Sequence, residues 1–396
     1  MFIGGSQVDH TRLSVGSVVR PGVSFSDQVR AAALRLGFDA VGITRASDPL
    51  DEDFARYQAF VSEGRHGEMA WLAAHESVRQ RLDGDGILSG AKSVVCVARR
   101  YQRPAEADAG RSDDVPTFAH AIARYARGRD YHRFLRRRVR RLAAFVRALG
   151  TDEHPVRARP MCDDAPVLER AWAVRAGLGF IGKNGMLIVP GLGSMVLLGE
   201  VVTTLDLSLD LGDVPPGPSG RRPHVQDRCG ACTRCIDACP TRAFSSAFVL
   251  DPRRCVSYLT IEQRGAIPVE LREGVGSHLF GCDDCQTVCP FNAGIAARTT
   301  LDTRDGDPFA PLERWSSARL ESLLSLDESA WRELFEGTPL RRAGRAGIAR
   351  NAAVVLGNRR DPNALPALRA AASGHEDPVV REAAAWGVAR IEKPVG

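Results

Sequence analysis

Eight of the ten cysteines fall in two runs whose spacing is typical of iron–sulfur ligands. The first run is Cys229-Gly-Ala-Cys232-Thr-Arg-Cys235-Ile-Asp-Ala-Cys239-Pro240, and the second is Cys255 followed by Cys282-Asp-Asp-Cys285-Gln-Thr-Val-Cys289-Pro290. The two-residue spacing lets successive thiolates surround one [4Fe–4S] cubane. The cysteine before each proline lies beyond that wrap and binds the other cluster, so the pattern predicts two clusters with crossed ligands.

The crossed arrangement gives four ligands to each cluster. We expect one cluster on Cys229, Cys232, Cys235 and Cys289, and the other on Cys239, Cys255, Cys282 and Cys285. Structural zinc is the first alternative, but two C-x3-C-P tails with a long insertion fit zinc poorly. Disulfides are the second, and they are rare in the cytoplasm.

The remaining two cysteines, Cys96 and Cys162, are predicted to be buried core residues. Cys96 lies in the apolar run Ser93–Ala98, which is typical of a buried strand. Cys162 precedes an acidic pair and could face a site, but a small buried residue is the simpler interpretation.

Composition restricts the class of protein. A chain of 396 residues predicts two or three domains, and its 44% apolar content is typical of a globular protein. No stretch of about 20 apolar residues predicts a membrane span, and the N-terminus has no apolar signal-peptide core. We therefore expect a cytoplasmic protein with a poorly ordered leader over residues 1–25. The net charge of +5 weakly favours an anionic partner.

The order of patterns predicts an α+β/α multidomain fold. Residues 26–210 alternate helix and strand as an α/β domain, with helices over 26–36, 53–63 and 131–149 and strands over 38–44, 93–98 and 195–205. A Gly/Pro-rich linker, 211–220, leads to a ferredoxin-like domain over 221–295. Residues 310–396 are all-helical, with amphipathic segments 343–357, 364–372 and 377–391. Two of them resemble HEAT repeats about 31 residues apart, which must dock on the rest of the protein.

Six blocks of sequence resemble the epoxyqueuosine reductase family. They are Gly67–Leu72, Arg124–His132, Asp163–Arg170, Ala176–Asn184, Cys255–Glu262 and Gly281–Pro290. The resemblance implies a cobalamin cofactor held between the α/β domain and the cluster domain, with the α/β domain as the cobalamin-binding domain. It also implies a tRNA partner, in which the epoxide of epoxyqueuosine at the wobble position is reduced to the alkene of queuosine, the last step of queuosine synthesis.

The resemblance also assigns site residues. Removal of an epoxide oxygen needs two electrons and a proton source, and Asp163 matches the family's acid. Its carboxyl would hold a proton if burial and the neighbouring Asp164 raised its pKa. The family usually has Ser or Thr where Asp164 stands. The residues alone allow a solvated or helix-capping pair instead.

Further contacts are expected from the same alignment of motifs and from charge. Residues expected at the cobalamin, in addition to Asp163, are Arg81, Arg170, Lys183, Asn184 and Ser257. Residues expected at tRNA are Arg124, Arg127, Arg129, Tyr131 and Arg264, with the run 133–141 behind them. The tail offers four more arginines, namely Arg341, Arg342, Arg345 and Arg350.

Three other functions remain open from the sequence. A ferredoxin-type electron-transfer protein would need no acid and no corrinoid. A reductive dehalogenase would share the cofactors, but such enzymes are typically exported with a twin-arginine signal. An RNA-binding scaffold with structural clusters would tolerate loss of Asp163. For the favoured function we expect a monomer, with no membrane association, that receives electrons from an external donor.

Overall fold

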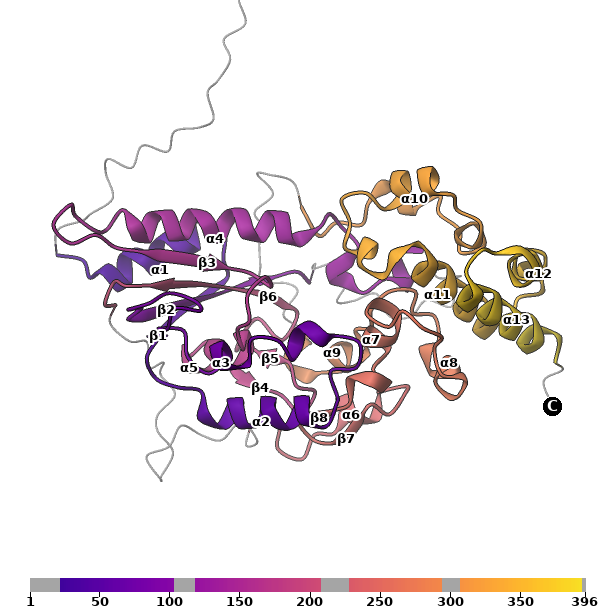
Figure 1. Cartoon of the computed structure of the whole chain (residues 1–396), viewed down its shortest axis with the longest axis horizontal. Helices are drawn as coiled ribbons and strands as arrows, with labels where there is room; N and C mark the ends of the chain where they lie inside the picture. The colour runs from indigo at the N-terminus through magenta and orange to yellow at the C-terminus, as the bar shows by residue number, and fades with distance from the viewer. Residues whose placement is uncertain (1–21, 103–117, 208–227, 294–306, 394–396) are drawn as a thin grey trace, which may run out of the picture.

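The structure, a computed structural model, describes residues 22–102, 118–207, 228–293 and 307–393. Residues 1–21 of the predicted leader and the predicted linker, 211–220, lie outside these ranges. Within them, an N-terminal sheet with its helices, a cysteine-rich region and a helical tail follow one another along the chain (Figure 1). No helix of the described residues is long and apolar enough to cross a membrane.

The N-terminal region is built on a four-stranded sheet with the order β1-β2-β6-β3. Its strands are β1 (Ala40–Arg45), β2 (Ser93–Arg100), β6 (Val196–Thr203) and β3 (Ala158–Met161). Every neighbouring pair is antiparallel, although the helix–strand alternation alone left strand direction open. All eight residues of β2 are buried because both faces of the sheet are covered.

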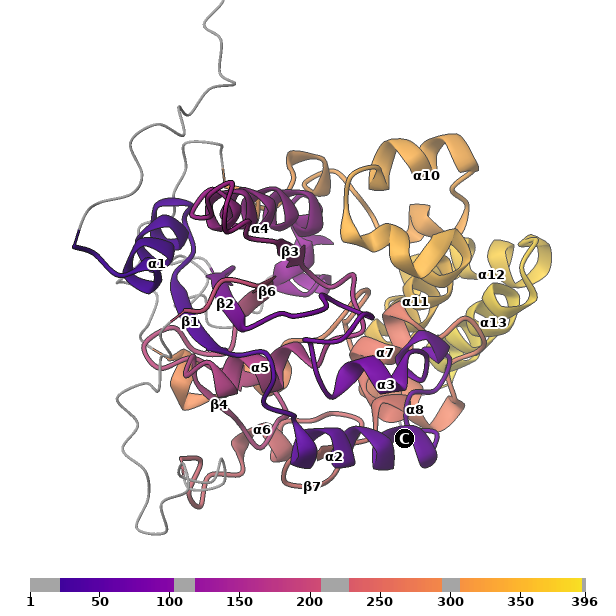
Figure 2. The same ribbon diagram turned by 60° about the vertical axis from the view of Figure 1, so that its left-hand side comes forward.

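Helices cover the two faces of this sheet (Figures 1 and 2). On one face α1 (Phe25–Arg35) and α4 (Tyr131–Arg147) share an apolar core with the strands. On the other face lies α5 (Glu169–Arg175), with α2 (Asp51–Ser62) and the short α3 (Glu76–Arg79) nearby. The Ser24 side chain caps α1 by accepting the Asp27 N–H, and Ser26, the first residue of the predicted helix, is buried inside it.

Close packing fixes α5 against the sheet. A Cβ atom on Gly42 of β1 would lie 2.1 Å from the carbonyl oxygen of Ala176, the C-cap of α5. Only glycine permits this approach of helix to strand. The first residue of α5, Glu169, is therefore held at a defined distance from the strands.

The cysteine-rich region is connected to the sheet region by buried polar groups. Its helices are α6 (Arg234–Asp237), α7 (Val256–Ile261), α8 (Val269–Val275) and α9 (Asp284–Thr287), with a hairpin of β7 (Phe244–Ser246) and β8 (Val249–Leu250). The Ser194 N–H donates to Oδ1 of Asn292 at 2.7 Å, and Nδ2 of Asn292 donates to the Gln286 carbonyl at 2.7 Å. Ser194 follows the hairpin of β4 (Phe180–Ile181) and β5 (Leu187–Ile188). These bonds set the cluster-binding loops against the sheet region.

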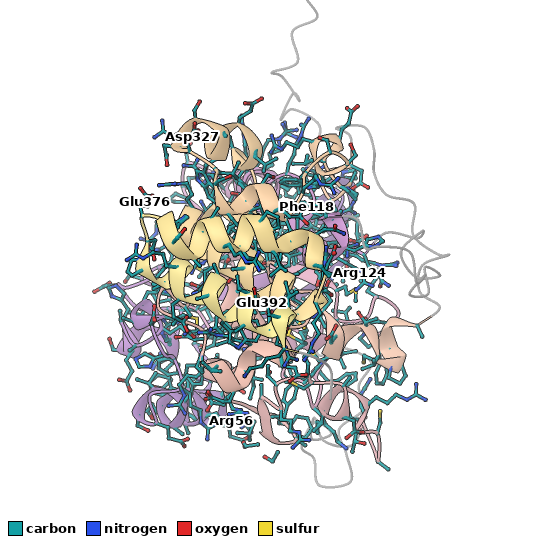
Figure 3. The ribbon with its side chains drawn as sticks, turned by 90° about the vertical axis from the view of Figure 1, so that its right-hand side faces the viewer. Arg56, Phe118, Arg124, Asp327, Glu376 and Glu392 are labelled. Carbon is teal, nitrogen blue, oxygen red and sulfur yellow. The ribbon has the colours of Figure 1, made fainter. Side chains whose placement is uncertain are left out.

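The tail is helical, as predicted. It contains α10 (Glu328–Phe335), α11 (Gly344–Arg359), α12 (Leu365–Gly374) and α13 (Pro378–Glu392), which lie together at one end of the molecule (Figure 3). One apolar core includes residues of α11, α12 and α13 together with Leu259 of α7 and Phe280. The predicted docking of the repeats on the rest of the protein is therefore confirmed.

Arg350 of α11 is part of that docking surface and not of the outer face. It is 1% exposed, and its guanidinium donates to the carbonyls of Gln263, Gly265 and Leu259 at 2.7–2.8 Å. The next residue, Asn351, donates to the carbonyls of Thr260 and Leu279. The expectation of a tRNA contact at Arg350 is therefore wrong, because this cation satisfies backbone carbonyls between two domains.

Candidate functional site

Asp163 lies just beyond β3, where two residues from the start of α4 meet it. Its Oδ2 accepts the Tyr131 hydroxyl at 2.9 Å and lies 3.1 Å from Nε2 of His132. Nδ1 of the same imidazole lies 2.7 Å from Oδ1 of Asp130, the N-cap of α4. The helix start and the strand end thus form one hydrogen-bonded group of two carboxylates, an imidazole and a phenol.

The charges of this group differ from the expectation for a protonated Asp163. Burial raises the pKa of Asp163, but hydrogen bonds from His132 and Tyr131 outweigh it, and the pKa lies below its ordinary value. Burial would lower the pKa of His132, yet its bonds to Asp130 and Asp163 raise that pKa to about 9. At neutral pH the structure therefore holds an imidazolium beside a carboxylate, with the proton on His132.

The Asp163 turn also explains how an aspartate can stand at position 164. Oδ1 of Asp164 accepts the Cys162 N–H at 3.0 Å, the local bond that a Ser or Thr hydroxyl can also accept. Nε of Arg136 lies 3.4 Å from Oδ2 of Asp164 and compensates its charge. Asp164 thus acts through the backbone of the turn, and it is absent from the groups that shift the pKa of Asp163 most.

The first two residues of α5, Glu169 and Arg170, follow the Asp163 turn. Glu169 is half-buried and Arg170 is exposed, yet burial raises the pKa of Glu169 and lowers that of Arg170. Side chains that water reaches but that protein surrounds on most sides have this combination. The Arg170 guanidinium donates to the Gly185 carbonyl, and a Cβ atom at Gly185 would meet only that guanidinium. Asp163 is therefore joined to Glu169 by a hydrogen bond, and the neighbouring Arg170 is joined to the Gly185 loop.

Arg81 lines a cavity formed by residues of α3 and the segment that follows it. The cavity has a volume of about 360 Å³ and is lined by Ser77, Val78, Arg81, Asp83, Gly84, Asp85, Gly86 and Ile87. The Arg81 guanidinium is paired in two bonds with the Asp83 carboxylate, at 3.0 and 2.7 Å. Arg159, on the strand that leads to Asp163, donates to the carbonyls of Gly86 and Ile87. The cavity is thus held to the strand that carries the acid.

The clustered cysteines lie near enough to interact electrostatically, in two neighbouring sets. After burial, the groups that raise the pKa of Cys235 are Cys289, Cys229 and Cys232. In addition to burial, Cys255 and Cys285 raise the pKa of Cys282, and Cys255 and Cys239 raise that of Cys285. Cys285 also interacts with Cys235, so the two groups are neighbours. All eight are free thiols, half-buried or buried, as cluster ligands would be. The other two cysteines, Cys96 and Cys162, are 1% exposed, as expected for core residues.

Three of the residues expected at the cobalamin contact the cysteine loops. Nζ of Lys183 donates to the carbonyls of Gly230 and Cys232, at 2.6 and 3.0 Å. Nδ2 of Asn184 donates to the Cys285 carbonyl at 3.4 Å, and the Ser257 hydroxyl accepts the Cys282 N–H at 3.1 Å. These side chains therefore shape the cluster-binding loops, a role that sequence reasoning missed.

The residues expected at tRNA separate into four sets. Tyr131 belongs to the Asp163 group. The Arg127 and Arg264 guanidiniums donate to nearby backbone carbonyls, and Arg124 donates to the Thr287 hydroxyl at 2.9 Å and pairs with Asp283. The run 133–141 is only partly exposed, because the buried Arg138 donates to the Leu36 carbonyl and stacks on Phe134.

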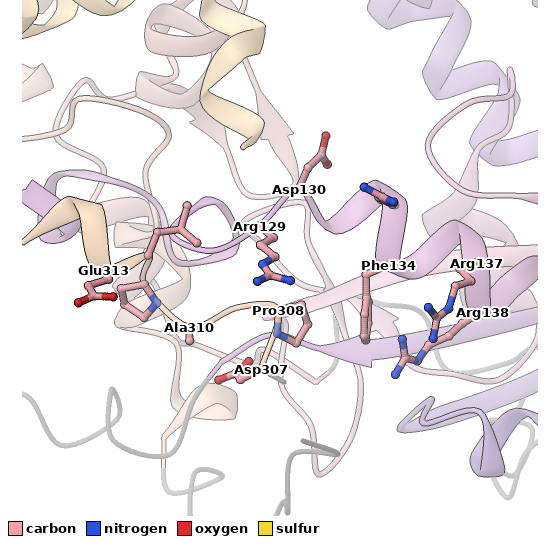
Figure 4. A pocket seen from close by; sticks show the side chains of 12 residues that line it. Arg129, Asp130, Phe134, Arg137, Arg138, Asp307, Pro308, Ala310 and Glu313 are labelled. Carbon is pink, nitrogen blue, oxygen red and sulfur yellow. The ribbon is translucent and has the colours of Figure 1, made fainter. Parts of the chain in front are cut away.

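Arg129 differs from these residues because it borders a cavity of about 620 Å³. The lining includes Arg129, Arg133, Arg137 and Arg138 with Asp307 and Pro308 (Figure 4). Asp163 does not line it, but Asp130, which contacts His132, does. The cavity is therefore an arginine-rich surface next to the Asp163 group.

The sequence analysis did not predict that His132 contacts Asp163, although His132 lies in the block Arg124–His132. It also missed the neighbourhood of Arg342, whose guanidinium binds Glu262, lies 5.7 Å from the centre of the exposed Trp71 ring and lowers the pKa of Asp163 through its charge. Trp71, Glu262 and Arg342 come from different regions of the chain. Only the fold brings them together, so no local spacing could have shown them.

Comparisons with known proteins agree with this geometry. Residues 228–292 match the "4Fe-4S double cluster binding domain", residues 81–164 match "Epoxyqueuosine reductase QueG, DUF1730", and residues 340–395 match "HEAT repeats". An epoxyqueuosine reductase from Pseudomonas aeruginosa is 40% identical over 90% of this chain and 91% of its own length. One from Xanthomonas campestris is 39% identical over 92% and 95%.

A solved structure adds the fold as a whole. The crystal structure of epoxyqueuosine reductase with an epoxyqueuosine-modified tRNA-Tyr stem loop superposes with a TM-score of 0.76 at 30% identity, over 93% of this chain and 90% of that one. The matched family models fall in all three parts of the molecule. The chain therefore belongs to the epoxyqueuosine reductase family and is an oxidoreductase.

Proposed function

We propose that this protein reduces epoxyqueuosine in tRNA to queuosine, with two [4Fe–4S] clusters, cobalamin and Asp163 as the proton donor. The observation that carries the proposal is the Asp163 carboxylate itself. It is held between the Tyr131 hydroxyl and the His132 imidazole, and its backbone N–H is bound by Glu169.

The cysteine groups fit two cubane clusters. Each group offers four thiols, which is the ligand number of a [4Fe–4S] cluster. Lys183 and Asn184 hold the loops of both groups from the sheet side. When bound, the clusters carry single electrons, and the cobalamin supplies a strongly reducing cobalt centre for cleavage of the carbon–oxygen bond.

Glu169 and Arg170 offer polar groups to a large cofactor that carries amide side chains. Arg170 offers donors and Glu169 offers acceptors, and both are accessible to water although protein surrounds them. The Gly185 loop leaves open space beside Arg170. We propose these residues as the wall that holds the corrin ring, with Arg81 as a further contact at the edge of its own cavity.

Asp163 and His132 would supply protons in sequence. Conversion of an epoxide to an alkene and water consumes two electrons and two protons. Before the substrate binds, His132 holds the proton. Substrate and cofactor exclude water from the site, which disfavours the ion pair and moves the proton from Nε2 of His132 to Oδ2 of Asp163. Asp163 then protonates the oxygen as the carbon–oxygen bond breaks. A second proton, which His132 takes from solvent and passes through Asp163, releases the oxygen as water.

The proposed macromolecular substrate is tRNA. The related structure with a tRNA stem loop supports this, as does the arginine-rich cavity that Arg129 borders. The exposed Trp71 ring beside the Arg342 guanidinium offers a stacking surface for an unpaired base near the acid. We also propose that the protein acts in the cytoplasm as a monomer and receives electrons from an external one-electron donor.

The other functions weighed from the sequence fit less well. An electron-transfer protein gives no reason for a carboxylate bound by both Tyr131 and His132. A reductive dehalogenase is disfavoured because epoxyqueuosine reductases match about 90% of the chain at 39–40% identity. A scaffold with structural clusters gives no role to the Asp163 group.

One assay tests the proposal. Wild type and Asp163→Asn, reconstituted anaerobically, receive cobalamin, a strong reductant and tRNA containing epoxyqueuosine, and the nucleosides are identified by mass spectrometry. We expect queuosine from wild type and a loss of roughly 100-fold or more in the variant, the scale of general acid catalysis. The exposed Asp152→Asn serves as a matched control and should act like wild type. No queuosine from cluster-replete, cobalamin-loaded wild type would refute the proposed reaction.

A further inference from the structure

Two glutamates behind Asp163 have no part in the proton transfer described above. Glu169, the first residue of α5, accepts the backbone N–H of Asp163 on Oε1 at 2.9 Å. Glu200 lies on the central strand β6, opposite Cys96 of β2 and Met161 of β3. Both therefore lie close to the turn that carries the acid.

The Asp163 turn needs support from its surroundings. Asp163 has a φ of 55°, in the left-handed region that residues with a side chain rarely adopt. Such a conformation persists only where neighbouring contacts hold it. Two bonds do so here: the Asp163 N–H to Glu169, and the Cys162 N–H to Asp164. Glu169 is thus the contact that fixes the amide of the acid itself.

Glu200 occupies an unusual position for a carboxyl group. It is 0% exposed, and neither carboxyl oxygen has a hydrogen-bond partner among the described residues. Its neighbours Cys96 and Met161 belong to the core that α5 covers, and directly paired residues of antiparallel strands share a face. The Glu200 side chain therefore points to the face on which α5 presents Glu169.

The charged groups that face this pair are mostly acidic. Asp163 and Asp164 act on both glutamates, while Arg170 is the cation that acts on Glu169. Arg170 is exposed and donates to the Gly185 carbonyl, so it compensates the pair only in part. The thiols of Cys96 and Cys162 complete the surroundings.

Burial and like charge favour one shared proton. Burial first and the Asp163 charge next raise the pKa of Glu169 to about 7. Burial and then the Glu169 charge raise the pKa of Glu200 well above its ordinary value. Two interacting carboxyls lose their protons in two steps that belong to the pair. If both glutamates lost their protons, the second negative charge would form next to the first and close to the Asp163 carboxylate.

We propose that Glu169 and Glu200 form a positioning pair for Asp163, in which Glu169 holds the amide of the acid and Glu200 keeps a proton on the pair. The role in catalysis rests on the function proposed above, whereas the pair itself does not. A protonated or amide-containing side chain at position 169 still presents an oxygen to the Asp163 N–H. Loss of that oxygen releases the turn and misplaces the acid.

Three variants separate positioning from a general structural role. Glu169→Gln keeps an acceptor oxygen, Glu169→Ala removes it, and Glu200→Gln removes the second ionisable group with little change of shape. The exposed Glu333→Gln is the matched control. We expect single-turnover queuosine formation to fall roughly 10- to 100-fold in Glu169→Ala, the scale of a lost hydrogen bond to a charged group. Glu169→Gln, which keeps an acceptor oxygen for the Asp163 N–H, should lose less activity than Glu169→Ala.

Two readouts do not depend on activity. Hydrogen exchange followed by mass spectrometry should show a faster Asp163 amide in Glu169→Ala and wild-type protection in Glu169→Gln. Infrared difference spectra of the holoenzyme should show a protonated carboxyl that titrates near pH 7, with a lower midpoint in Glu200→Gln. Equal exchange in Glu169→Ala and wild type, or no carboxyl titrating near neutrality, would overturn the pair. A wild type that forms no queuosine would instead overturn the proposed reaction and leave these two readouts valid.

Discussion

Nε2 of His132 lies 3.1 Å from Oδ2 of Asp163, while Nδ1 of the same ring lies 2.7 Å from Oδ1 of Asp130. The imidazole is thus fixed at both nitrogens by carboxylates. Because both nitrogens donate only in the imidazolium form, the arrangement favours the protonated ring. A proton on Nε2 of His132 is one hydrogen bond away from Asp163, the proposed acid.

The first prediction concerns pH. The folded-state pKa of His132, about 9, lies above the ordinary value of about 6.5. Its contribution to stability is therefore complete below about pH 6.5 and is lost as the pH rises through 9. The same proton feeds Asp163, so single-turnover reduction should be level up to about pH 8 and fall about tenfold per unit above 9. Rapid-quench assays across this range measure it.

His132→Gln provides the control for this pH profile. The amide can still donate to one carboxylate but cannot store a proton. We expect a slower reaction, by roughly 10- to 100-fold, with no fall above pH 9. A variant that kept the wild-type pH profile would assign the titration to another group.

The second prediction concerns Tyr131, whose hydroxyl donates to Asp163 at 2.9 Å. Tyr131→Phe removes this donor and leaves the ring in its contacts with Tyr125 and His132. Since the bond lowers the pKa of Asp163, its loss should raise that pKa and keep more of the proton on Asp163. The reaction should retain at least a tenth of the wild-type rate, and carboxyl infrared bands should report the shift. A rate as low as that of Asp163→Asn would make the hydroxyl a proton donor in its own right.

The third prediction tests the crossed ligands of the clusters. Cys289 is far in sequence from Cys229, Cys232 and Cys235 but lies with them in space. Cys289→Ala should therefore disturb the cluster of the first cysteine run, and Cys239→Ala the cluster of the second. Iron content and electron paramagnetic resonance of each variant should show one altered cluster and one intact. Cys96→Ala, in the core, should keep both, and identical spectra for Cys289→Ala and Cys239→Ala would argue against crossing.

Local patterns predicted the cluster region and the helical tail because their information is contiguous in the sequence. The spacing of thiols sets what one cubane can reach, and the apolar repeat of the tail requires a partner surface. Cys96 and Cys162 were predicted as core residues for the same reason, since each stands in or beside an apolar strand. The expected direction of the Asp163 pKa shift was wrong, because the dominant groups, Tyr131 and His132, are 32 and 31 residues away.

Charged residues were the hardest to interpret from sequence. Arg350 and Arg138 resemble exposed cations in the pattern, yet both are buried and donate to carbonyls of other elements. A carbonyl that lacks a partner leaves no trace in the sequence. The burial of Glu200 likewise could not be predicted, because a single glutamate within an apolar strand does not show which face it occupies.

The fourth prediction follows from the buried position of Arg350. Arg350→Met fills similar volume but leaves the carbonyls of Leu259, Gln263 and Gly265 without their donor. Each buried unsatisfied group is costly, so the free energy of unfolding should fall by about 3 kcal/mol. Thermal unfolding of the reconstituted protein should show a lower Tm. Arg341→Met, at an exposed pair with Glu336, should change it by less than about 1 kcal/mol.

The fifth prediction concerns which arginines bind tRNA. Arg129 borders the arginine-rich cavity, whereas the guanidinium of Arg127 donates to the Ile122 carbonyl. A cation that meets a phosphate releases a counterion, so Arg129→Gln should weaken tRNA binding and reduce the slope of log K against log salt by about 1. Arg127→Gln should lower stability and leave the salt slope unchanged. Binding isotherms at several salt concentrations measure both, and an unchanged slope in Arg129→Gln would place the phosphates on another face. Because catalytic-site residues are intact in both variants, any loss of turnover in Arg129→Gln should be recovered at saturating tRNA.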